Sequence, residues 1–310
     1  MRRIDFKDFQ DIVKNEILDY LPDDFQNAEI KISKMEKLGK TYNAMTIMRE
    51  KNGMSPAINL DRFYEEYQNG SMLPECLHTM ARTIRDSQRE FNVDWIQNYD
   101  EVKKHLFIRV SNAEKNEVLL EKVPHELKDD LVITCHIEIS NEYGSLMSAI
   151  VSNQMLDMYG ITREQLIQDS IENSVRIMPP TIRLLGDIIG EHMPETKGGV
   201  IPAYVISNKL GLNGASAMFY PNVLEYVSQK IGGDVIIAPS SIHEVIALPV
   251  RSDEDIGRLE DTVRFINDTQ VSESDQLGDH LYRYDARSHS LESIWSDSAT
   301  NNYTNSAFLM

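Results

Sequence analysis

Cysteine and long apolar stretches are both scarce in this chain of 310 residues. Cys76 and Cys135 are its two cysteines, and both lie in segments with the apolar periodicity of a core. We therefore expect reduced structural thiols, as in a cytoplasmic protein, and no disulfide framework. No segment approaches the ~18 uninterrupted apolar residues of a membrane span, and the start "MRRIDFKDFQ" lacks an apolar stretch of signal-peptide length. The sequence predicts a cytoplasmic protein without a membrane segment.

Basic residues are also fewer than acidic ones. The chain has 31 Lys and Arg against 49 Asp and Glu, a formal net charge of −18 at pH 7. We expect no direct binding to nucleic acid, because the phosphate backbone is recognised by clustered basic residues, and the basic stretch Lys31–Lys40 is interrupted by Glu36. The acidic excess is spread along the chain and indicates a solvated surface. The negative charge leaves one alternative open. In it, the protein is an acidic decoy that mimics nucleic acid and binds a nucleic-acid-binding protein.

The apolar residues present are sufficient for a folded protein, since 41% of the chain is hydrophobic and 26% is charged. Phe6, Phe9 and Val13 begin a series with helical spacing, and residues 77–91 form a second amphipathic pattern. Between these helices, residues 28–60 alternate apolar and polar side chains in short runs, as in an antiparallel meander. We predict a helix–β-meander–helix domain over residues 1–98.

The rest of the chain combines strand-like runs with capped helices. Runs such as "DLVITCHIEISN" and "DVIIAP" are joined by short turns, which favour antiparallel pairing. Residues 99–267 are predicted to form an α+β domain, and residues 268–310, which are rich in Ser, Asp and Asn, a disordered polar and acidic tail. The predicted fold class is α+β, with mostly antiparallel sheets and packed amphipathic helices.

The stretch "PSSIHE", residues 239–244, places polar side chains between two apolar runs. Ser241 and His243 are two residues apart, so on an extended strand they share a face, which raises the hypothesis of a hydrolase centred on Ser241, His243 and Glu244. Glu244 would point to the opposite face, however, and no G-x-S-x-G elbow is present. We therefore favour a hairpin in which Pro239 closes one strand, Ser240 and Ser241 form the turn, and His243 opens the return strand.

Metal and cofactor motifs are incomplete. No H-E-x-x-H spacing or cysteine pair occurs, so no metal site is predicted. "GLNGAS", residues 211–216, lacks both the P-loop lysine pattern and G-x-G-x-x-G, so no cofactor is predicted either.

The segment 203–249 carries several short motifs in order. They are Ser207-Asn208 at a strand exit, Gly214-Ala215 at a helix start, Tyr220-Pro221, and "PSSIHE". In this combination the chain resembles an uncharacterised clostridial family, domain of unknown function 5688, over most of residues 4–267, although Ala113 stands where an aromatic residue is expected. The resemblance makes "PSSIHE" a family hallmark and implies no known activity, cofactor or partner. The candidate binding residues on these motifs are Asn208, Gly214, Tyr220 and Ser240.

Because no catalytic motif is complete, we expect a non-catalytic, intracellular binding or regulatory module with a protein partner. The hydrolase centred on "PSSIHE" and the acidic decoy are the alternatives.

Overall fold

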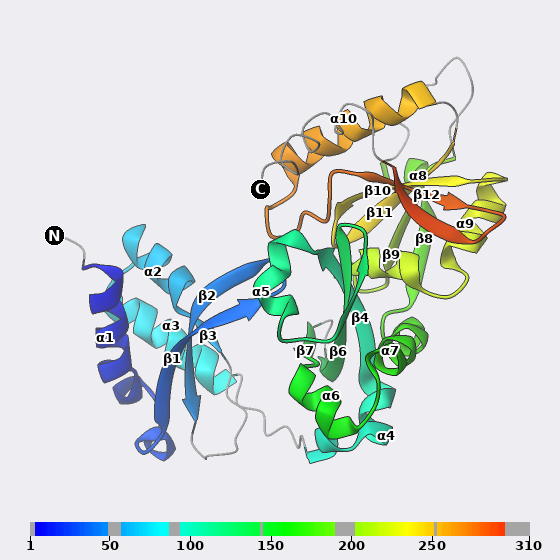
Figure 1. The fold of residues 1–310 in the computed structure, drawn as a ribbon. Coiled ribbons are helices and arrows are strands. Elements are labelled where there is room, and N and C mark those ends of the chain that lie inside the picture. Colours follow the sequence, from blue (N-terminus) through cyan, green and yellow to red (C-terminus); the bar gives the residue numbers. More distant parts are fainter. Residues whose placement is uncertain are drawn as a thin grey trace, which may run out of the picture. The chain divides into compact units, whose positions relative to one another are not determined.

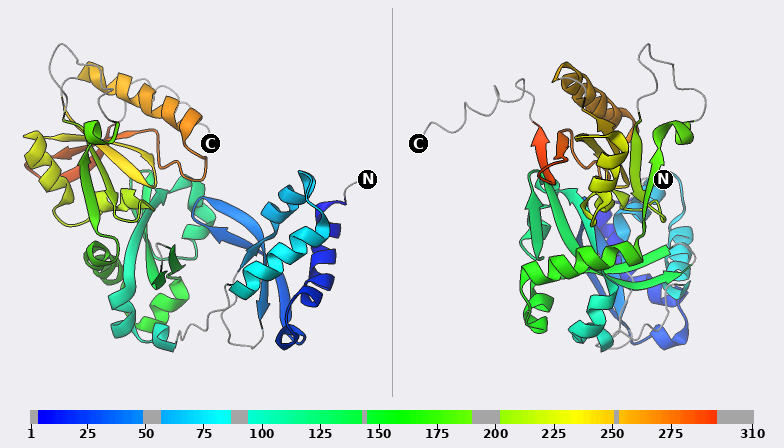
Figure 2. Two further views of the ribbon diagram at one scale, coloured as in Figure 1. Left: turned by 180° about the vertical axis from the view of Figure 1, so that it is seen from behind. Right: turned by 90° about the vertical axis from the view of Figure 1, so that its right-hand side faces the viewer.

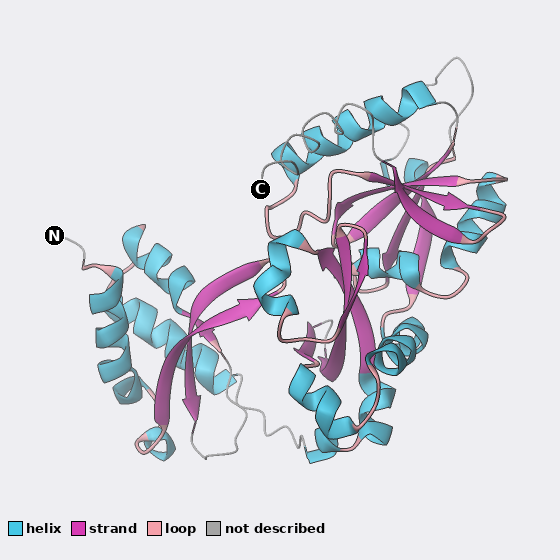
Figure 3. Ribbon diagram, in the orientation of Figure 1, coloured by secondary structure: helices cyan, strands magenta, loops and turns pink. Residues whose placement is uncertain are grey.

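The computed structural model describes residues 4–48, 57–86, 94–142, 145–189, 202–250 and 253–294. The chain divides into two compact units, Met1–Asn92 and Val93–Met310 (Figure 1). Both units combine helices with antiparallel sheets, as the colouring by secondary structure in Figure 3 shows. The predicted α+β fold class is confirmed.

The first unit packs helices on a small sheet. The sheet has the order β1-β2-β3, and both of its strand pairs are antiparallel. Its core joins Phe9 and Val13 of the first helix to Met45 of the sheet and to Leu77 and Met80 of the last helix. The elements are α1 (Phe6–Glu16), η1 (Ile17–Tyr20), η2 (Asp23–Phe25), β1 (Glu29–Lys37), β2 (Lys40–Met48), β3 (Ile58–Asn59), α2 (Leu60–Gln68) and α3 (Leu73–Asp86).

The second unit begins with a four-stranded antiparallel sheet. Its longest strand, β6, pairs with β4 along one edge and with β5 and then β7 along the other. The elements of this part are η3 (Asp94–Gln97), α4 (Tyr99–Val102), η4 (Lys103–His105), β4 (Leu106–Asn112), η5 (Glu114–Asn116), α5 (Glu117–Leu120), β5 (His125–Lys128), β6 (Leu131–Glu142), β7 (Ser145–Ile150), α6 (Asn153–Tyr159) and α7 (Arg163–Ile177).

Helix α7 buries one carboxylate against this sheet. The side chain of Asp169 is 3% exposed and lies 2.7 Å from Lys103 Nζ. The Tyr99 hydroxyl donates to Asp169 at 2.6 Å, and Gln165 Nε2 donates at 2.9 Å. These three groups compensate for the burial of the Asp169 carboxylate. Through Tyr99 and Lys103, the carboxylate attaches α7 to the start of the second unit.

A six-stranded antiparallel sheet completes the second unit, in the order β13-β12-β10-β11-β9-β8. Ile236 and Ala238 of β10 face α10, whereas Val235 and Ile237 face the core that this sheet shares with β4 and β6. Figure 2 shows α10 lying along one side of this sheet. The elements are β8 (Pro180–Leu184), α8 (Leu185–Ile189), β9 (Tyr204–Asn208), η6 (Gly214–Phe219), α9 (Val223–Ile231), β10 (Val235–Ser241), β11 (Glu244–Pro249), α10 (Asp253–Gln270), β12 (Leu281–Asp285) and β13 (Ser290–Ile294).

The prediction of a disordered tail from residue 268 is wrong for residues 268–294. Strand β12 pairs with β10, and β13 pairs with β12. Leu277 and Leu281 are 0% exposed, and Tyr282 is 1% exposed. The segment is poor in apolar residues, but it joins an existing sheet, so backbone pairing and these few buried side chains are enough to order it. Residues 295–310 of the predicted tail lie outside the described residues.

Candidate functional site

The "PSSIHE" stretch forms the end of the β10–β11 hairpin. Strand β10 continues through Ser241, which pairs with Glu244, and a register shift between Ala238 and Ser241 marks a bulge. The two turn residues are therefore Ile242 and His243. The predicted turn at Ser240 and Ser241 is wrong, because a bulge lets the strand pass its proline without breaking the pairing.

The polar atoms of this hairpin form three hydrogen bonds, each of which involves a backbone group. Ser241 Oγ accepts a hydrogen bond from the His243 amide at 3.0 Å. His243 Nδ1 accepts from the Asn213 amide at 3.3 Å, and the His243 carbonyl accepts from Ser207 Oγ at 2.8 Å. The hairpin end is therefore tied to the exit of β9 and to the loop before η6.

These contacts do not form a nucleophile–base–acid relay. A serine nucleophile requires a hydrogen bond between its hydroxyl and the imidazole, whereas Ser241 binds the main chain and His243 Nδ1 is occupied by an amide. The other ring nitrogen, Nε2, lies 3.9 Å from Asp275 Oδ2. Glu244 is exposed at the start of β11. Thus the structure brings Ser241 and His243 together but does not align the candidate catalytic groups.

Two of the candidate binding residues shape the adjoining loop. Asn208 Oδ1 accepts from the Leu210 amide at 2.9 Å, and its Nδ2 donates to the Leu212 carbonyl at 2.8 Å. A Cβ atom on Gly214 would lie 2.2 Å from Ser207 Oγ, 2.4 Å from the His243 carbonyl oxygen and 2.8 Å from the Asn208 amide nitrogen. Only glycine fits this close approach without a shift in the surrounding chain.

The other two candidate binding residues are Tyr220 and Ser240. Tyr220 is 3% exposed, burial raises the pKa of its hydroxyl, and among the described residues this hydroxyl has no hydrogen-bond partner. It ends η6 and lines a cleft of ≈ 670 Å³. The side chain of Ser240 lies outside the described part of the chain.

This cleft lies between η6 and the start of α9 on one side and the β12–β13 hairpin on the other, with β5 contributing one residue. Its lining is a mixture of apolar, aromatic and polar side chains. The apolar lining residues used below are Phe219, Leu224, Tyr284 and Leu291, and the polar ones are Lys128, Glu225 and His289.

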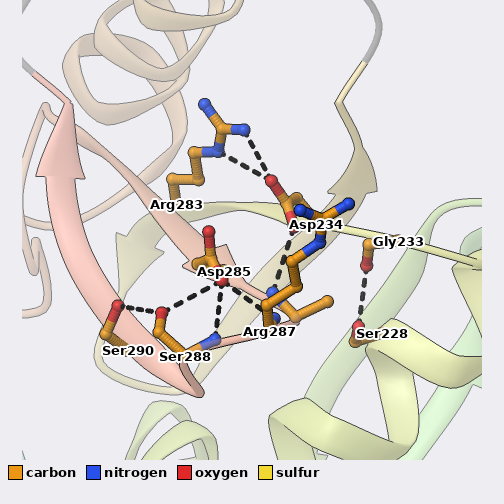
Figure 4. Close-up of polar contacts among 9 residues, drawn as sticks. Ser228, Gly233, Asp234, Arg283, Asp285, Arg287, Ser288 and Ser290 are labelled. Carbon is orange, nitrogen blue, oxygen red and sulfur yellow. Dashed lines mark hydrogen bonds and ion pairs between the residues drawn. The ribbon is translucent and has the colours of Figure 1, made fainter.

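Polar contacts fix the hairpin wall of the cleft (Figure 4). Asp234, just before β10, accepts from the Ala286 amide at 3.0 Å and from Arg283 Nη2 at 2.5 Å. The bond from Ala286 and then the one from Arg283 lower the pKa of Asp234. Asp285 accepts from the amides of Arg287 and Ser288, each at 2.8 Å. The turn between β12 and β13 is thereby attached to β10.

Two side chains of this wall bind each other. The Tyr284 hydroxyl lies 2.8 Å from His289 Nδ1, and the two rings meet edge to face. His289 has φ 57°, a left-handed conformation that is uncommon for residues other than glycine. Burial, followed by Glu225 and Asp285, raises the pKa of Tyr284. Neither Tyr284 nor His289 is among the candidates predicted from the sequence, although the alternation of Tyr282 and Tyr284 is the pattern of a half-buried strand.

Across the described residues, no three His, Cys, Asp or Glu side chains are gathered as a metal site. None of the described helices is long and apolar enough to span a membrane.

The fold and these motifs define an α+β protein built on antiparallel sheets. The chain belongs to the family of unknown function DUF5688, which matches it over residues 6–286. The family resemblance seen in the sequence is therefore confirmed, and the match extends through β12. No curated protein and no solved structure matches the chain.

Proposed function

We propose that this protein is a non-catalytic binding or regulatory module that recognises a protein partner at the cleft beside Tyr220. The observation that carries the proposal is the cleft itself, of ≈ 670 Å³, with its aromatic and aliphatic lining. Phe219, which is partly exposed, supplies an aromatic surface of the kind that dominates binding energies. Lys128 and Glu225 at the same cleft supply charges of both signs that can orient a peptide segment.

The hydrogen bonds that the "PSSIHE" side chains form with the backbone favour a binding role over a catalytic one. The Ser241 hydroxyl and His243 Nδ1 both accept hydrogen bonds from backbone amides. A hydrolase would need the hydroxyl and the ring to bind each other, at least in the substrate complex. In the proposed role the hairpin instead fixes the loop that leads to η6, and η6 forms one wall of the cleft.

Site-specific photo-crosslinking tests the recognition site. Replacement of Phe219 by p-benzoylphenylalanine keeps an aromatic ring in the cleft and should yield a discrete covalent adduct with one protein in the native extract. The matched control is the same replacement at Phe265 on α10, which is 66% exposed and does not line the cleft. Adding Leu291→Asp to the Phe219 probe should abolish the adduct, because it places a charge in the apolar wall.

Two results would contradict the proposal. One is the same adduct pattern at Phe219 and at Phe265, or no adduct at either. The other is a turnover that His243→Ala abolishes while the melting temperature stays unchanged, since this would make His243 catalytic. We expect instead that His243→Ala and Ser241→Ala each lower the melting temperature by several degrees and leave the adduct intact, because each removes a hydrogen bond worth ~1–3 kcal/mol.

A further inference from the structure

A second polar cluster lies on one face of the β4-β6-β7 sheet, away from the residues that line the cleft. Arg109 of β4 pairs with Thr134 of β6, and on the same face His136 and Glu138 follow Thr134 at two-residue steps. Ser148 of β7 pairs with Glu138. The cluster therefore brings one arginine, one histidine, one glutamate and two hydroxyl groups onto three adjacent strands.

The arginine of this cluster lacks the counter-charge that buried cations normally have. Arg109 Nη2 donates to Ser148 Oγ at 2.7 Å, while Arg109 Nε is buried without a hydrogen-bond partner. Within the described part of the chain no carboxylate forms an ion pair with it, and Glu138 lies 3.9 Å from His105 instead. Burial lowers the pKa of Arg109 to about 10. Such a group is unfavourable unless an anion accompanies it.

The neighbours of Arg109 do not compensate its charge. His136 is 4% exposed, and burial followed by the charge of Arg109 lowers its pKa well below its ordinary value, so the ring is neutral. His136 Nε2 lies 3.1 Å from Thr134 Oγ1. The Phe107 ring lies under the guanidinium, with its centroid 5.5 Å from Cζ. A ring face contributes a cation–π attraction of only ~0.5–2 kcal/mol, less than an ionic hydrogen bond network supplies.

We propose that Arg109, oriented by Ser148, binds a small anion that carries a carboxylate or phosphate group. Arg109 is half-buried as a residue and its Nε is buried, so an anion would have to reach the guanidinium through its Nη atoms. A guanidinium held in this way matches the paired oxygens of either group. The site is independent of the cleft and of the partner proposed for it.

Thermal melting in sodium phosphate, sodium acetate and sodium chloride at equal ionic strength tests this site. Phosphate or acetate should raise the melting temperature of the native chain with increasing concentration, because a ligand that binds only the folded state stabilises it. Arg109→Met keeps the apolar stem over Phe107 and should weaken that anion's affinity roughly ten- to a hundredfold. The matched control, Arg258→Met, changes an exposed arginine on α10 and should leave the affinity unchanged.

The response to the two anions identifies the chemistry. An effect of phosphate alone assigns a phosphate group, and an effect of acetate alone assigns a carboxylate. If all three salts act equally, or if Arg109→Met responds to the anions as the native chain does, the proposal is wrong and Arg109 only covers Phe107. Should Arg109→Met fail to fold, Ser148→Ala replaces it, because loss of the orienting bond should also weaken the anion's affinity.

Discussion

Gly214→Ala should be among the most disruptive single-methyl changes in the second unit. The added Cβ would lie 2.2 Å from Ser207 Oγ and 2.4 Å from the His243 carbonyl oxygen, the two atoms of one hydrogen bond. Overpacking by one methyl group costs ~1–3 kcal/mol. Loss of the bond between Ser207 and His243 adds ~1–3 kcal/mol. We therefore expect the free energy of unfolding to fall by about 2–6 kcal/mol, and the melting temperature by roughly 5–20 °C.

Urea denaturation followed by tryptophan fluorescence measures this change, because Trp95 lies in η3 of the second unit and the sequence of the first unit, Met1–Asn92, contains no tryptophan. The control is Gly233→Ala, where a Cβ would meet no atom within 4 Å. We expect that variant to stay within about 1 kcal/mol of the native chain. If Gly214→Ala unfolds at the same urea concentration as the control, the close approach at Gly214 does not determine stability and the reasoning fails.

Three further predictions follow from burial and pairing. Burial by itself raises the pKa of Asp169, but hydrogen bonds, first from Lys103, lower it overall. Asp169→Asn should therefore lower the free energy of unfolding by about 2–3 kcal/mol at neutral pH, measured by urea titration. The difference between the native chain and the variant should shrink as the pH falls below ~4, because protonation of Asp169 at its lowered folded-state pKa removes the stability that its ionised form supplies. Cys76 and Cys135 are buried, and burial raises the pKa of Cys135 to about 12, so Ellman's reagent should label neither thiol before unfolding; labelling in the native state would contradict their burial. Truncation after Gln270 removes β12 and β13 and should abolish cooperative melting of the second unit, whereas unchanged melting would restore the disordered-tail prediction.

Local patterns in the sequence were sufficient for the fold class and for several elements. The helical spacing of Phe6, Phe9 and Val13 reflects burial of one face of α1, and that relation depends only on neighbouring residues. The apolar runs around "PSSIHE" likewise identified a hairpin. The turn position was wrong because a bulge depends on how two strands pair, and the pairing partner is not encoded next to the proline.

The sequence by itself therefore determined the α+β class, the family and the presence of a hairpin at "PSSIHE". Tertiary structure alone decided that residues 281–294 form two strands, because β12 pairs with β10, which lies far away in the chain, and β13 pairs with β12 at the edge of the sheet. Tertiary structure also decided which buried polar groups have hydrogen-bond partners. Gly214 meets Ser207 and His243 only after three segments converge, and Arg109 Nε is left without a partner among the described residues only because of the side chains that the sheet places around it. Such contacts join distant positions, and local periodicity carries no information about them.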